Sequence, residues 1–378
     1  MELFRRTVAD INIENLIHNW QQIKTAAGDD RFICPMVKAN AYGHGAPEVS
    51  LALESEGARA LGVCLIEEGL QLRAEGVHAE ILVFKGFDKR GAEKILEYQM
   101  TPVVSTWAQV YALEAVADEP VKVHLKFNTG MNRLGFAPDQ ADELASYFKK
   151  TKKLKLKALC SHLLSGDSSA IKIQLQRHAE ISSHFSGFDI FNHVLNSGGI
   201  ADHVTSPDLK QRWGFRPGLM LYGYHADAAN KCLDLQPVMS LKSVINNIQE
   251  LKAGETVSYS GTWQASRPSR VAVIPIGYAD GVHRLLSNNA EVLVGGSRAK
   301  VVGTVCMDFI MADVTDIIGS DDSLKWAEEE VVIFGYDENH QCLSADEVAL
   351  RAKTISWEIL TSVSGRVPRH FKGIKHHE

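Results

Sequence analysis

Short apolar runs that alternate with helix-compatible stretches constrain the fold of this chain more than any other feature. The eight runs cover residues 32–38, 60–66, 80–86, 101–105, 121–128, 156–163, 191–197 and 216–223. Eight strands alternating with helices are what a parallel (β/α)8 barrel, a TIM-like barrel, requires. An open doubly wound sheet is the alternative, but it usually needs fewer strands, and no Gly-x-Gly-x-x-Gly motif opens the first helix.

The pattern changes near residue 230. From Gln236 to about Gly335 the chain reads as short strands punctuated by Gly, Asp and Ser, which is typical of an all-β sandwich or barrel. A short helix is expected near residues 345–355, followed by an extended tail. We therefore expect an α/β fold with an N-terminal barrel over residues 1–230 and a C-terminal all-β domain over 231–378. The earliest residues also resemble a strand, which we expect to pair with the second domain.

Composition excludes several classes of protein. Apolar residues make up 45% and charged residues 23% of the 378, which is ordinary for a globular chain. The net charge of −6 argues against a general nucleic-acid binder. No apolar run approaches the roughly 20 residues needed to span a bilayer, and acids occur near the N-terminus where a signal peptide needs an apolar stretch. The six cysteines form no Cys-x-x-Cys pair, so reduced thiols of a cytoplasmic protein fit better than disulfides or structural zinc.

Polar residues at the carboxyl ends of the strands are where such barrels carry function. Lys38 ends the first run, where desolvation can lower the pKa of its amine and make it a nucleophile or a base; a lone lysine there is more often solvated. Three glycine clusters also stand at strand ends: AYGHG after Lys38, NSGG with Ser197, and RPG from Arg216. Each alone is usually a turn, but together they favour a phosphate-bearing cofactor.

For the other candidate site residues, the evidence from the sequence is weaker when each is taken alone. His162 can be a metal ligand, a base or a satisfied core histidine, and metal is the least expected because no second ligand stands at the right spacing. Taken singly, Arg133 and Arg216 are by default interpreted as members of structural ion pairs. His376 and His377 read as an exposed tail.

In the β domain, Tyr259 and Tyr278 lie beside glycines, and Met307 and Asp308 follow in CMDFIMADV. Tyrosines in strands are commonly packing residues, so spacing alone makes neither catalytic.

The segment MVKANAYGHG is highly specific, and with it the chain resembles the alanine racemases, pyridoxal-phosphate-dependent enzymes of fold type III. The resemblance covers nearly the whole chain through KFNTGMNRLGF, SHLLSGD, NSGG, RPGLMLYG, VSYSGTW, IPIGYADG, VCMDF and GRVPR. It implies an isomerase that interconverts L-alanine and D-alanine for peptidoglycan, with pyridoxal 5'-phosphate as its cofactor. It also implies a head-to-tail homodimer with shared active sites.

The resemblance assigns roles to residues of this chain. Lys38 holds the cofactor covalently, and Arg216 faces the pyridine nitrogen. Arg133 approaches the phenolic oxygen and the substrate, and Lys126 matches a position that is often carbamylated to hold Arg133. Further cofactor-binding positions are Tyr42, His162, Asn196, Ser197, Gly218, Leu219 and Trp357.

The partner subunit contributes the other residues that the resemblance implies. Tyr259 reaches the partner's active site, where His162 supports it. Tyr278, Met307 and Asp308 match substrate-binding positions, Met307 through its backbone amide.

Trp357 departs from the family pattern, which usually has a tyrosine there that binds phosphate and narrows the substrate entrance. An indole N–H donates one hydrogen bond but accepts none, and the ring is larger. This substitution puts the substrate preference in question.

Racemisation needs a proton removed from one face and returned on the other, which Lys38 and Tyr259 would do. A tyrosine with a pKa of about 10 needs cationic neighbours such as His162. Arg216 only donates hydrogen bonds, so it would leave the pyridine nitrogen unprotonated and limit transamination.

Three alternatives stay open at this point. One is a racemase of broader or different specificity, for serine or lysine, which Trp357 keeps open. A basic-amino-acid decarboxylase would place an acid where Arg216 stands. A non-catalytic pyridoxal phosphate carrier would resemble the barrel alone.

Overall fold

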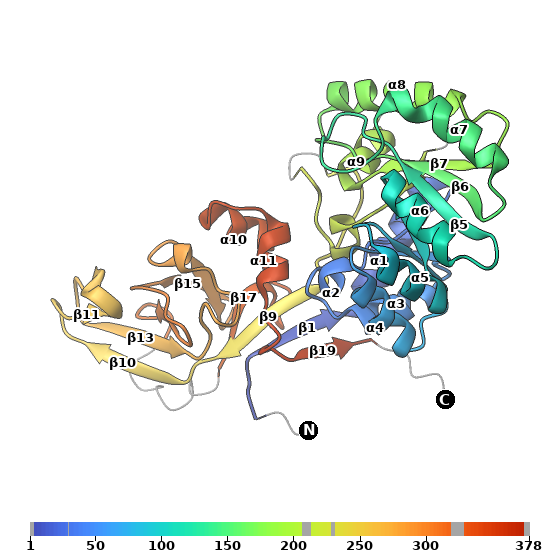
Figure 1. The fold of residues 1–378 in the computed structure, drawn as a ribbon. Coiled ribbons are helices and arrows are strands. Elements are labelled where there is room, and N and C mark those ends of the chain that lie inside the picture. The colour runs from blue at the N-terminus through green and yellow to red at the C-terminus, as the bar shows by residue number, and fades with distance from the viewer. Residues whose placement is uncertain (1–3, 29, 206–212, 228–230, 319–328, 374–378) are drawn as a thin grey trace. The chain divides into compact units, whose positions relative to one another are not determined.

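The computed structural model describes residues 4–28, 30–205, 213–227, 231–318 and 329–373. Residue 230 at the expected domain boundary, and the tail residues His376 and His377, lie outside these ranges. The chain divides into two units (Figure 1). The barrel unit comprises residues 16–41 and 45–236, and the strand unit comprises residues 1–15, 42–44 and 237–378.

A parallel sheet of seven strands, in the order β2-β3-β4-β5-β6-β7-β8, forms the barrel unit. The strands are β2 (Ala60–Val63), β3 (Glu80–Val83), β4 (Thr101–Val104), β5 (Val121–Lys126), β6 (Leu154–Cys160), β7 (Phe191–Leu195) and β8 (Gly214–Phe215). The expected architecture of alternating parallel strands and helices is confirmed.

The first apolar run closes the sheet through two isolated bridges rather than as a regular strand. Ile33 pairs with Phe215 of β8, and Met36 pairs with Gly62 of β2. Pro35 stands between them and has no N–H to donate to a ladder, although its carbonyl accepts the Gly62 N–H at 2.8 Å. The segment takes the place of an eighth strand without continuous pairing.

The expectation that residues 216–223 form the eighth strand is wrong in detail. The strand β8 ends at Phe215, and the next residues form the 3₁₀ helix η2 (Leu219–Tyr222), which ends at Gly223 with a φ of 94°. Pro217 again removes a ladder donor. Arg216 still lies at the carboxyl end of the sheet, one residue beyond β8.

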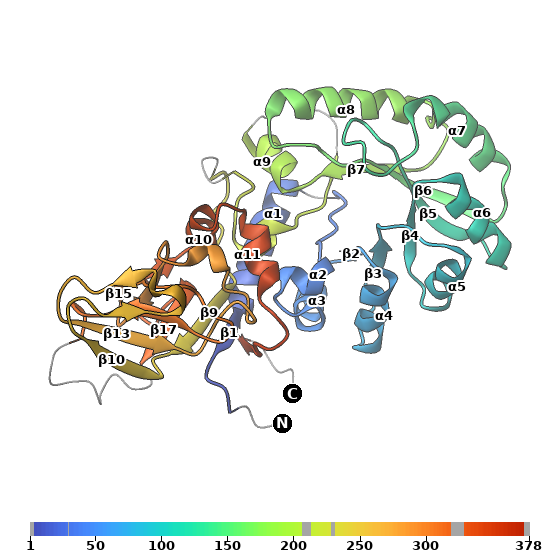
Figure 2. The same cartoon turned by 60° about the vertical axis from the view of Figure 1, so that its left-hand side comes forward.

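Helices α4 to α8 line the outer side of the parallel sheet (Figure 2). The helices that begin in or belong to this part of the chain are α1 (Ile13–Ala27), α2 (Lys38–Tyr42), α3 (Ala46–Ser55), α4 (Ile66–Ala74), α5 (Lys89–Glu97), α6 (Trp107–Val116), η1 (Pro138–Gln140), α7 (Ala141–Lys150), α8 (Ser168–Ser183) and α9 (Ser197–Thr205).

Side chains alternate along β5 between the apolar layer that packs against the helices and the polar inside of the barrel. Val123 and Leu125 pack in a buried cluster with helix residues such as Leu144 of α7. His124 and Lys126 point to the opposite face, because side chains alternate along a strand. This face lines the inside of the barrel, so β5 carries buried polar groups toward the carboxyl end.

The strand unit contains a ten-stranded sheet, which confirms the expected all-β character of the C-terminal part. Nine strands run in the order β10-β13-β16-β15-β14-β17-β9-β1-β19; β18 pairs with β17, and β11 and β12 form a separate pair. The N-terminal strand β1 pairs antiparallel with β9 and parallel with β19. The first residues of the chain are therefore part of this sheet.

The strands of this unit are β1 (Val8–Asn12), β9 (Met239–Val244), β10 (Asn247–Leu251), β11 (Thr256–Val257), β12 (Trp263–Gln264), β13 (Ser269–Ile274), β14 (Glu291–Val294), β15 (Ser297–Val301), β16 (Ile310–Asp313), β17 (Glu330–Tyr336), β18 (Cys342–Leu343) and β19 (Arg369–Lys372). The 3₁₀ helices η3 (Tyr259–Gly261) and η4 (Arg284–Leu286) lie in its loops.

Two short helices close this unit. The expected helix near residues 345–355 is present as α10 (Ala345–Arg351), whereas α11 (Ser356–Ser362) replaces part of the expected extended tail. Among the described residues, none of the helices has the length and hydrophobicity that crossing a bilayer requires.

Candidate active site

Lys38 begins a left-handed turn at the end of the segment that closes the barrel. The next three residues, 39–41, have φ of 52° to 53° and ψ of 47° to 50°. This conformation costs an L-residue roughly 1–2 kcal/mol. The turn is held by the Ala41 N–H, which donates to Val37 (2.8 Å), and by the Gly45 N–H, which donates to the Asn40 carbonyl (3.0 Å). Strain that the surroundings hold in place in this way is typical of functional sites.

A path of hydrogen bonds joins the Lys38 segment to two helix starts. The Met36 N–H donates to the Pro217 carbonyl at 2.8 Å. The next residue, Gly218, donates its N–H to the Ser197 hydroxyl at 3.2 Å. Ser197 is the first residue of α9, and Gly218 immediately precedes η2. The amine-bearing segment and both helix starts therefore lie at one rim of the barrel unit.

Glycines let the start of α9 pack closely against the loop that follows β6. A Cβ on Gly198 would lie 3.1 Å from the Gly166 Cα, and one on Gly199 would lie 2.4 Å from the Leu163 side chain. The Asn196 side-chain oxygen accepts the Gly199 N–H at 3.1 Å, which is an ordinary helix cap. The first N–H groups of a helix have no acceptor within the helix, so this start is suited to an anion.

Arg216 is 4% exposed and is fixed from inside the barrel. Its Nη1 donates to Nδ1 of His193 at 2.8 Å, and further bonds reach the carbonyls of His193 and Ser161. Nε2 of His193 lies 2.9 Å from Nδ1 of His124. A guanidinium cannot accept, so His193 accepts at Nδ1 and carries its proton on Nε2, from which it donates to His124.

Both histidines of this chain of bonds are neutral at neutral pH. Burial, followed by the charge of Arg216, lowers the pKa of His124 to about 3 and the pKa of His193 well below its ordinary value. Burial also lowers the pKa of Arg216, but arginine stays protonated in proteins. The guanidinium is therefore a fixed cation held by neutral acceptors.

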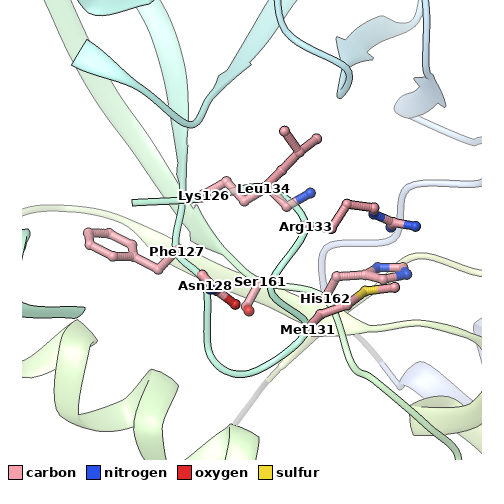
Figure 3. Close-up of a pocket in the computed structure, with 8 residues that line it drawn as sticks. All are labelled: Lys126, Phe127, Asn128, Met131, Arg133, Leu134, Ser161 and His162. Carbon is pink, nitrogen blue, oxygen red and sulfur yellow. The ribbon is translucent and has the colours of Figure 1, made fainter. Parts of the chain in front are cut away.

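A small pocket, open to solvent, lies beyond the ends of β5 and β6 (Figure 3). The residues that line it are Lys126, Phe127, Asn128, Met131, Arg133, Leu134, Ser161 and His162. Figure 3 shows Met131, Arg133 and His162 gathered on one side, with the amine of Lys126 extending toward that side. The pocket is therefore lined mainly by cationic and neutral polar groups together with a few apolar side chains.

Lys126 is a buried amine in cationic surroundings. It is 7% exposed and lines the pocket together with Arg133 and His162. Burial lowers its pKa, and the charges of Arg216 and Arg133 lower it further. A larger fraction of this amine is neutral than in an exposed lysine.

His162 is neutral, contrary to our expectation of a cationic neighbour for Tyr259. Burial, then the charges of Arg216, Lys126 and Arg133, lower its pKa to about 3. The cations of this site are the arginine and lysine side chains, and the imidazole is present as an uncharged group that can donate or accept.

Gln174 on α8 fixes the loops that carry His162 and Arg133. Its side-chain nitrogen donates to the Thr129 hydroxyl (3.0 Å) and to the His162 carbonyl (3.1 Å). Its oxygen accepts the Leu164 N–H at 2.7 Å. Gln174 is only 3% exposed, and both its side-chain nitrogen and its oxygen form hydrogen bonds. It therefore fixes the positions of the two loops relative to each other.

In the strand unit, Tyr259 projects into solvent from a constrained loop. It is 70% exposed, and its neighbours Ser258 and Ser260 have positive φ of 66° and 63°. The Ser258 hydroxyl donates to the Thr304 carbonyl (2.6 Å), and the Thr304 hydroxyl donates to the Tyr259 carbonyl (3.1 Å). The backbone is fixed while the phenol stays exposed.

The loops that carry Tyr278 and Met307 are joined through their backbones. Their side chains are 45% and 52% exposed. The Tyr278 N–H donates to the Cys306 carbonyl (3.0 Å), and the Ala279 N–H donates to the Met307 carbonyl (3.1 Å). A Cβ on Gly277 would lie 2.3 Å from that same oxygen, so only glycine permits this approach.

Two carboxylates beside these loops have arginine partners within the unit. Asp308, expected to bind substrate, accepts from Arg366 at 2.7 Å. Asp280 is fully buried, accepts from Arg5 at 2.7 Å and accepts the Gly277 N–H at 3.1 Å. The structure thus gives Asp308 an ion pair, and it identifies Asp280 as the anchor of the Tyr278 loop.

Tyr42 and Trp357 belong to a separate part of the strand unit. Tyr42 is buried, and a Cβ on the following Gly43 would lie 2.4 Å from the Leu360 carbonyl of α11. Arg369 donates to the Gly43 carbonyl at 2.9 Å. Residues 42–44 therefore pack against α11, which carries the half-buried Trp357.

The structure brings most predicted site residues of the barrel unit to one rim. These residues are Lys38, Lys126, Arg133, His162, Asn196, Ser197, Arg216, Gly218 and Leu219. Within the described residues, no group of three or more His, Cys, Asp or Glu side chains is arranged to hold a metal ion. Sequence reasoning missed His124, His193 and Gln174. The alternation in VKVHLK does place His124 on the same face as Lys126, and this was the available signal.

Comparisons with known proteins point to the same family over nearly the whole chain. The family description "Alanine racemase, N-terminal domain" matches residues 11–226, and "Alanine racemase, C-terminal domain" matches residues 238–371. A curated relative, alanine racemase 2 of Caldanaerobacter subterraneus subsp. tengcongensis, is 37% identical over 97% of this chain and 94% of its own length.

Solved structures show the same similarity. The alanine racemase of Clostridium difficile 630 is 31% identical with a TM-score of 0.89, over 98% of this chain and 97% of that one. An alanine racemase from Bartonella henselae, described with covalently bound pyridoxal phosphate, is 28% identical with a TM-score of 0.85, over 97% and 99% of the two chains.

Proposed function

Because the chain belongs to the alanine racemase family, we propose that its active site lies at the carboxyl rim of the barrel unit and is centred on Lys38, Ser197 and Arg216. The enzyme interconverts L-alanine and D-alanine and depends on pyridoxal phosphate. The observation that carries this placement is the hydrogen-bonded path from the Lys38 segment through Pro217 and Gly218 to Ser197.

The residues at this rim fit a phosphate-bearing aldehyde. Lys38 offers an amine that can hold an aldehyde covalently. The Ser197 hydroxyl and the N–H groups at the starts of α9 and η2 suit a phosphate. Glycine at 199 lets the start of α9 pack against Leu163, because a Cβ there would collide with that side chain. Arg216 would donate to the pyridine nitrogen. The cofactor contacts of Tyr42 and Trp357 are proposed on the family resemblance.

Two residues of this chain would move the proton. When bound, pyridoxal phosphate withdraws electrons from the α-carbon of the amino acid and makes its proton acidic. The Lys38 amine would act on one face and the Tyr259 hydroxyl on the other. A phenol with an ordinary pKa of about 10 needs positive charge nearby to act as a base. Arg216 and Arg133 supply that charge, since His162 is neutral.

Arg216 would also limit side reactions. As a permanent donor it leaves the pyridine nitrogen without a proton, which makes the ring a weaker electron sink. Protonation at the wrong carbon, which leads to transamination, would then be less frequent. His193 and the Ser161 carbonyl accept hydrogen bonds from the guanidinium, and these bonds would keep it in place for this role.

Lys126 is proposed to be carbamylated. Its lowered pKa leaves more neutral amine, which can add to carbon dioxide and lose a proton to form an anionic carbamate. The anion would pair with Arg133. Carbon-13 NMR of protein kept in labelled bicarbonate should show a carbamate signal that Lys126→Gln removes. Identical spectra for the two proteins would contradict the assignment.

We infer a head-to-tail homodimer in which Tyr259, Tyr278 and Met307 serve the partner's site, Met307 by donating its backbone N–H to the substrate carboxylate. The exposure of all three side chains supports this inference, because clustered exposed apolar groups commonly mark interfaces. Mixing inactive Lys38→Ala and Tyr259→Phe proteins should restore part of the activity, since one site of the heterodimer is intact. Proven subunit exchange without recovery would assign both residues to one subunit.

The activity is tested by racemisation of a panel of amino acids. The protein should convert L-alanine and D-alanine to an equal mixture faster than it converts serine or lysine, as measured by chiral product analysis. Faster turnover of serine or lysine would favour the racemase of different specificity. The match of the C-terminal domain over residues 238–371 counts against a cofactor carrier. Six free thiols support a cytoplasmic location.

A further inference from the structure

Glu68 divides its carboxylate between a helix start and the residue after Lys38. It is the third residue of α4, and its Oε2 accepts the N–H groups of Cys64 (2.7 Å) and Leu65 (2.9 Å). A glutamate at this position commonly caps a helix in this way. The second oxygen, Oε1, leaves the helix and accepts the N–H of Ala39 at 2.6 Å. A cap alone does not need this last bond.

Lys38 is consequently held on one side by strand β2 and on the other by helix α4, which follows it. On one side, the Val37 N–H donates to the Gly62 carbonyl at 2.9 Å. On the other, the Ala39 N–H donates to Glu68. Ala39 is the first of four consecutive non-glycine residues with positive φ, a conformation that persists only where surrounding groups over-determine it. A carboxylate is a stronger acceptor than a neutral carbonyl, so it suits a strained N–H.

We propose that Glu68 is a positioning residue for Lys38: its carboxylate holds Ala39 at the start of the left-handed turn and so sets the point from which the Lys38 amine reaches the cofactor. The inference rests on the proposed function of Lys38. Glu68 acts through the backbone of the turn. It also links the turn to α4, so a shift of this helix would move the residue that carries the reactive amine.

The test compares Glu68→Gln with Glu67→Gln, which is the same change at an exposed position one residue earlier in α4. A glutamine has one acceptor oxygen, so it cannot serve both the helix start and Ala39. Hydrogen–deuterium exchange of the full-length protein without cofactor should quicken in peptides covering residues 38–42 for Glu68→Gln and should match wild type there for Glu67→Gln.

Cofactor binding and kinetics give independent readouts. For Glu68→Gln we expect affinity for pyridoxal phosphate, from titration of its visible absorbance, to weaken about tenfold, the size of one lost charged hydrogen bond. We expect kcat to fall while KM for alanine changes little, because substrate contacts are untouched. Glu68→Asp keeps the charge but is one methylene shorter. It should retain the cap, lose the Ala39 bond and show the same losses.

Unchanged exchange over 38–42 and unchanged cofactor affinity in both Glu68 variants, with only a lower melting temperature, would show a helix cap and overturn the inference alone. If borohydride reduction of wild-type holoenzyme labels a lysine other than Lys38, the proposed function fails, and the inference fails with it. If Glu68→Gln does not fold, Glu68→Asp decides by the same measurements.

Discussion

The guanidinium of Arg216 donates to Nδ1 of His193 over 2.8 Å, and this contact determines the proton positions of two buried histidines. His193 must carry its proton on Nε2, and His124, 2.9 Å away, must accept it at Nδ1. The cation at the rim is thus oriented by a one-directional chain of hydrogen bonds that runs through the barrel interior.

Replacing His193 with leucine should therefore weaken catalysis through Arg216. The variant removes the imidazole acceptor of Arg216 and leaves only backbone carbonyls, and a hydrogen bond to a charged group contributes about 1.5–3 kcal/mol. We expect kcat/KM for alanine to fall roughly 10- to 150-fold. His193→Asn is the matched control, because its amide oxygen can accept near the position of Nδ1 and should recover part of the loss. Wild-type kinetics in His193→Leu would refute the orienting role.

We expect Asp280 to make a pH-dependent contribution to the free energy of unfolding. Burial alone would raise its pKa, but the hydrogen bond and charge of Arg5 hold the pKa below its usual value. A depressed carboxyl pKa contributes stability above the unfolded value of about 3.9, and the contribution is lost as pH falls through the folded pKa.

Asp280→Asn should accordingly lower the free energy of unfolding by about 1–3 kcal/mol at pH 7. The difference from wild type should begin to shrink below about pH 4, where the carboxyl of the unfolded chain takes up its proton, and should vanish only below the lowered pKa of the folded protein. Urea unfolding at pH 7 and at pH 3.5 measures both values. A difference that stays constant across this range would mean that the ion pair with Arg5 does not carry the effect.

Sequence reasoning pointed to the residues that we propose carry the chemistry, but it did not find the residues that hold them in place. Lys38, Ser197 and Arg216 stand at strand ends beside glycines, which is a local signal. His193 and Glu68 act through partners 23 and 29 residues away, and no periodicity encodes such bonds. Pro35 and Pro217 explain the two expected strands that do not form regular ladders, because a proline lacks the N–H that extended pairing needs.

Trp357 predicts the substrate preference. A bulky indole on α11 in place of the family's tyrosine should favour alanine over larger substrates, on the proposal that it narrows the entrance. Trp357→Tyr should bind the cofactor at least as tightly and gain relative activity on serine. The change should be modest, since one methylene in a pocket is worth about 1–3 kcal/mol.

The ratio of kcat/KM for alanine to that for serine, measured with cofactor affinity in parallel, checks this prediction. Trp357→Phe is the control that reduces size without adding a hydroxyl, so it separates bulk from hydrogen bonding. The same ratio in all three proteins would show that Trp357 does not determine the substrate preference.

The central claim is that Lys38 and Tyr259 act on opposite faces of the same α-carbon, and exchange of the α-proton in heavy water tests it most directly. Wild-type enzyme should incorporate deuterium from either enantiomer. Tyr259→Phe keeps the ring and should lose about 10²–10⁴-fold of its racemisation, as expected for a missing acid/base group. In that variant, exchange into L-alanine should fall much further than exchange into D-alanine, which Lys38 still serves. Wild-type exchange from both enantiomers would contradict the account.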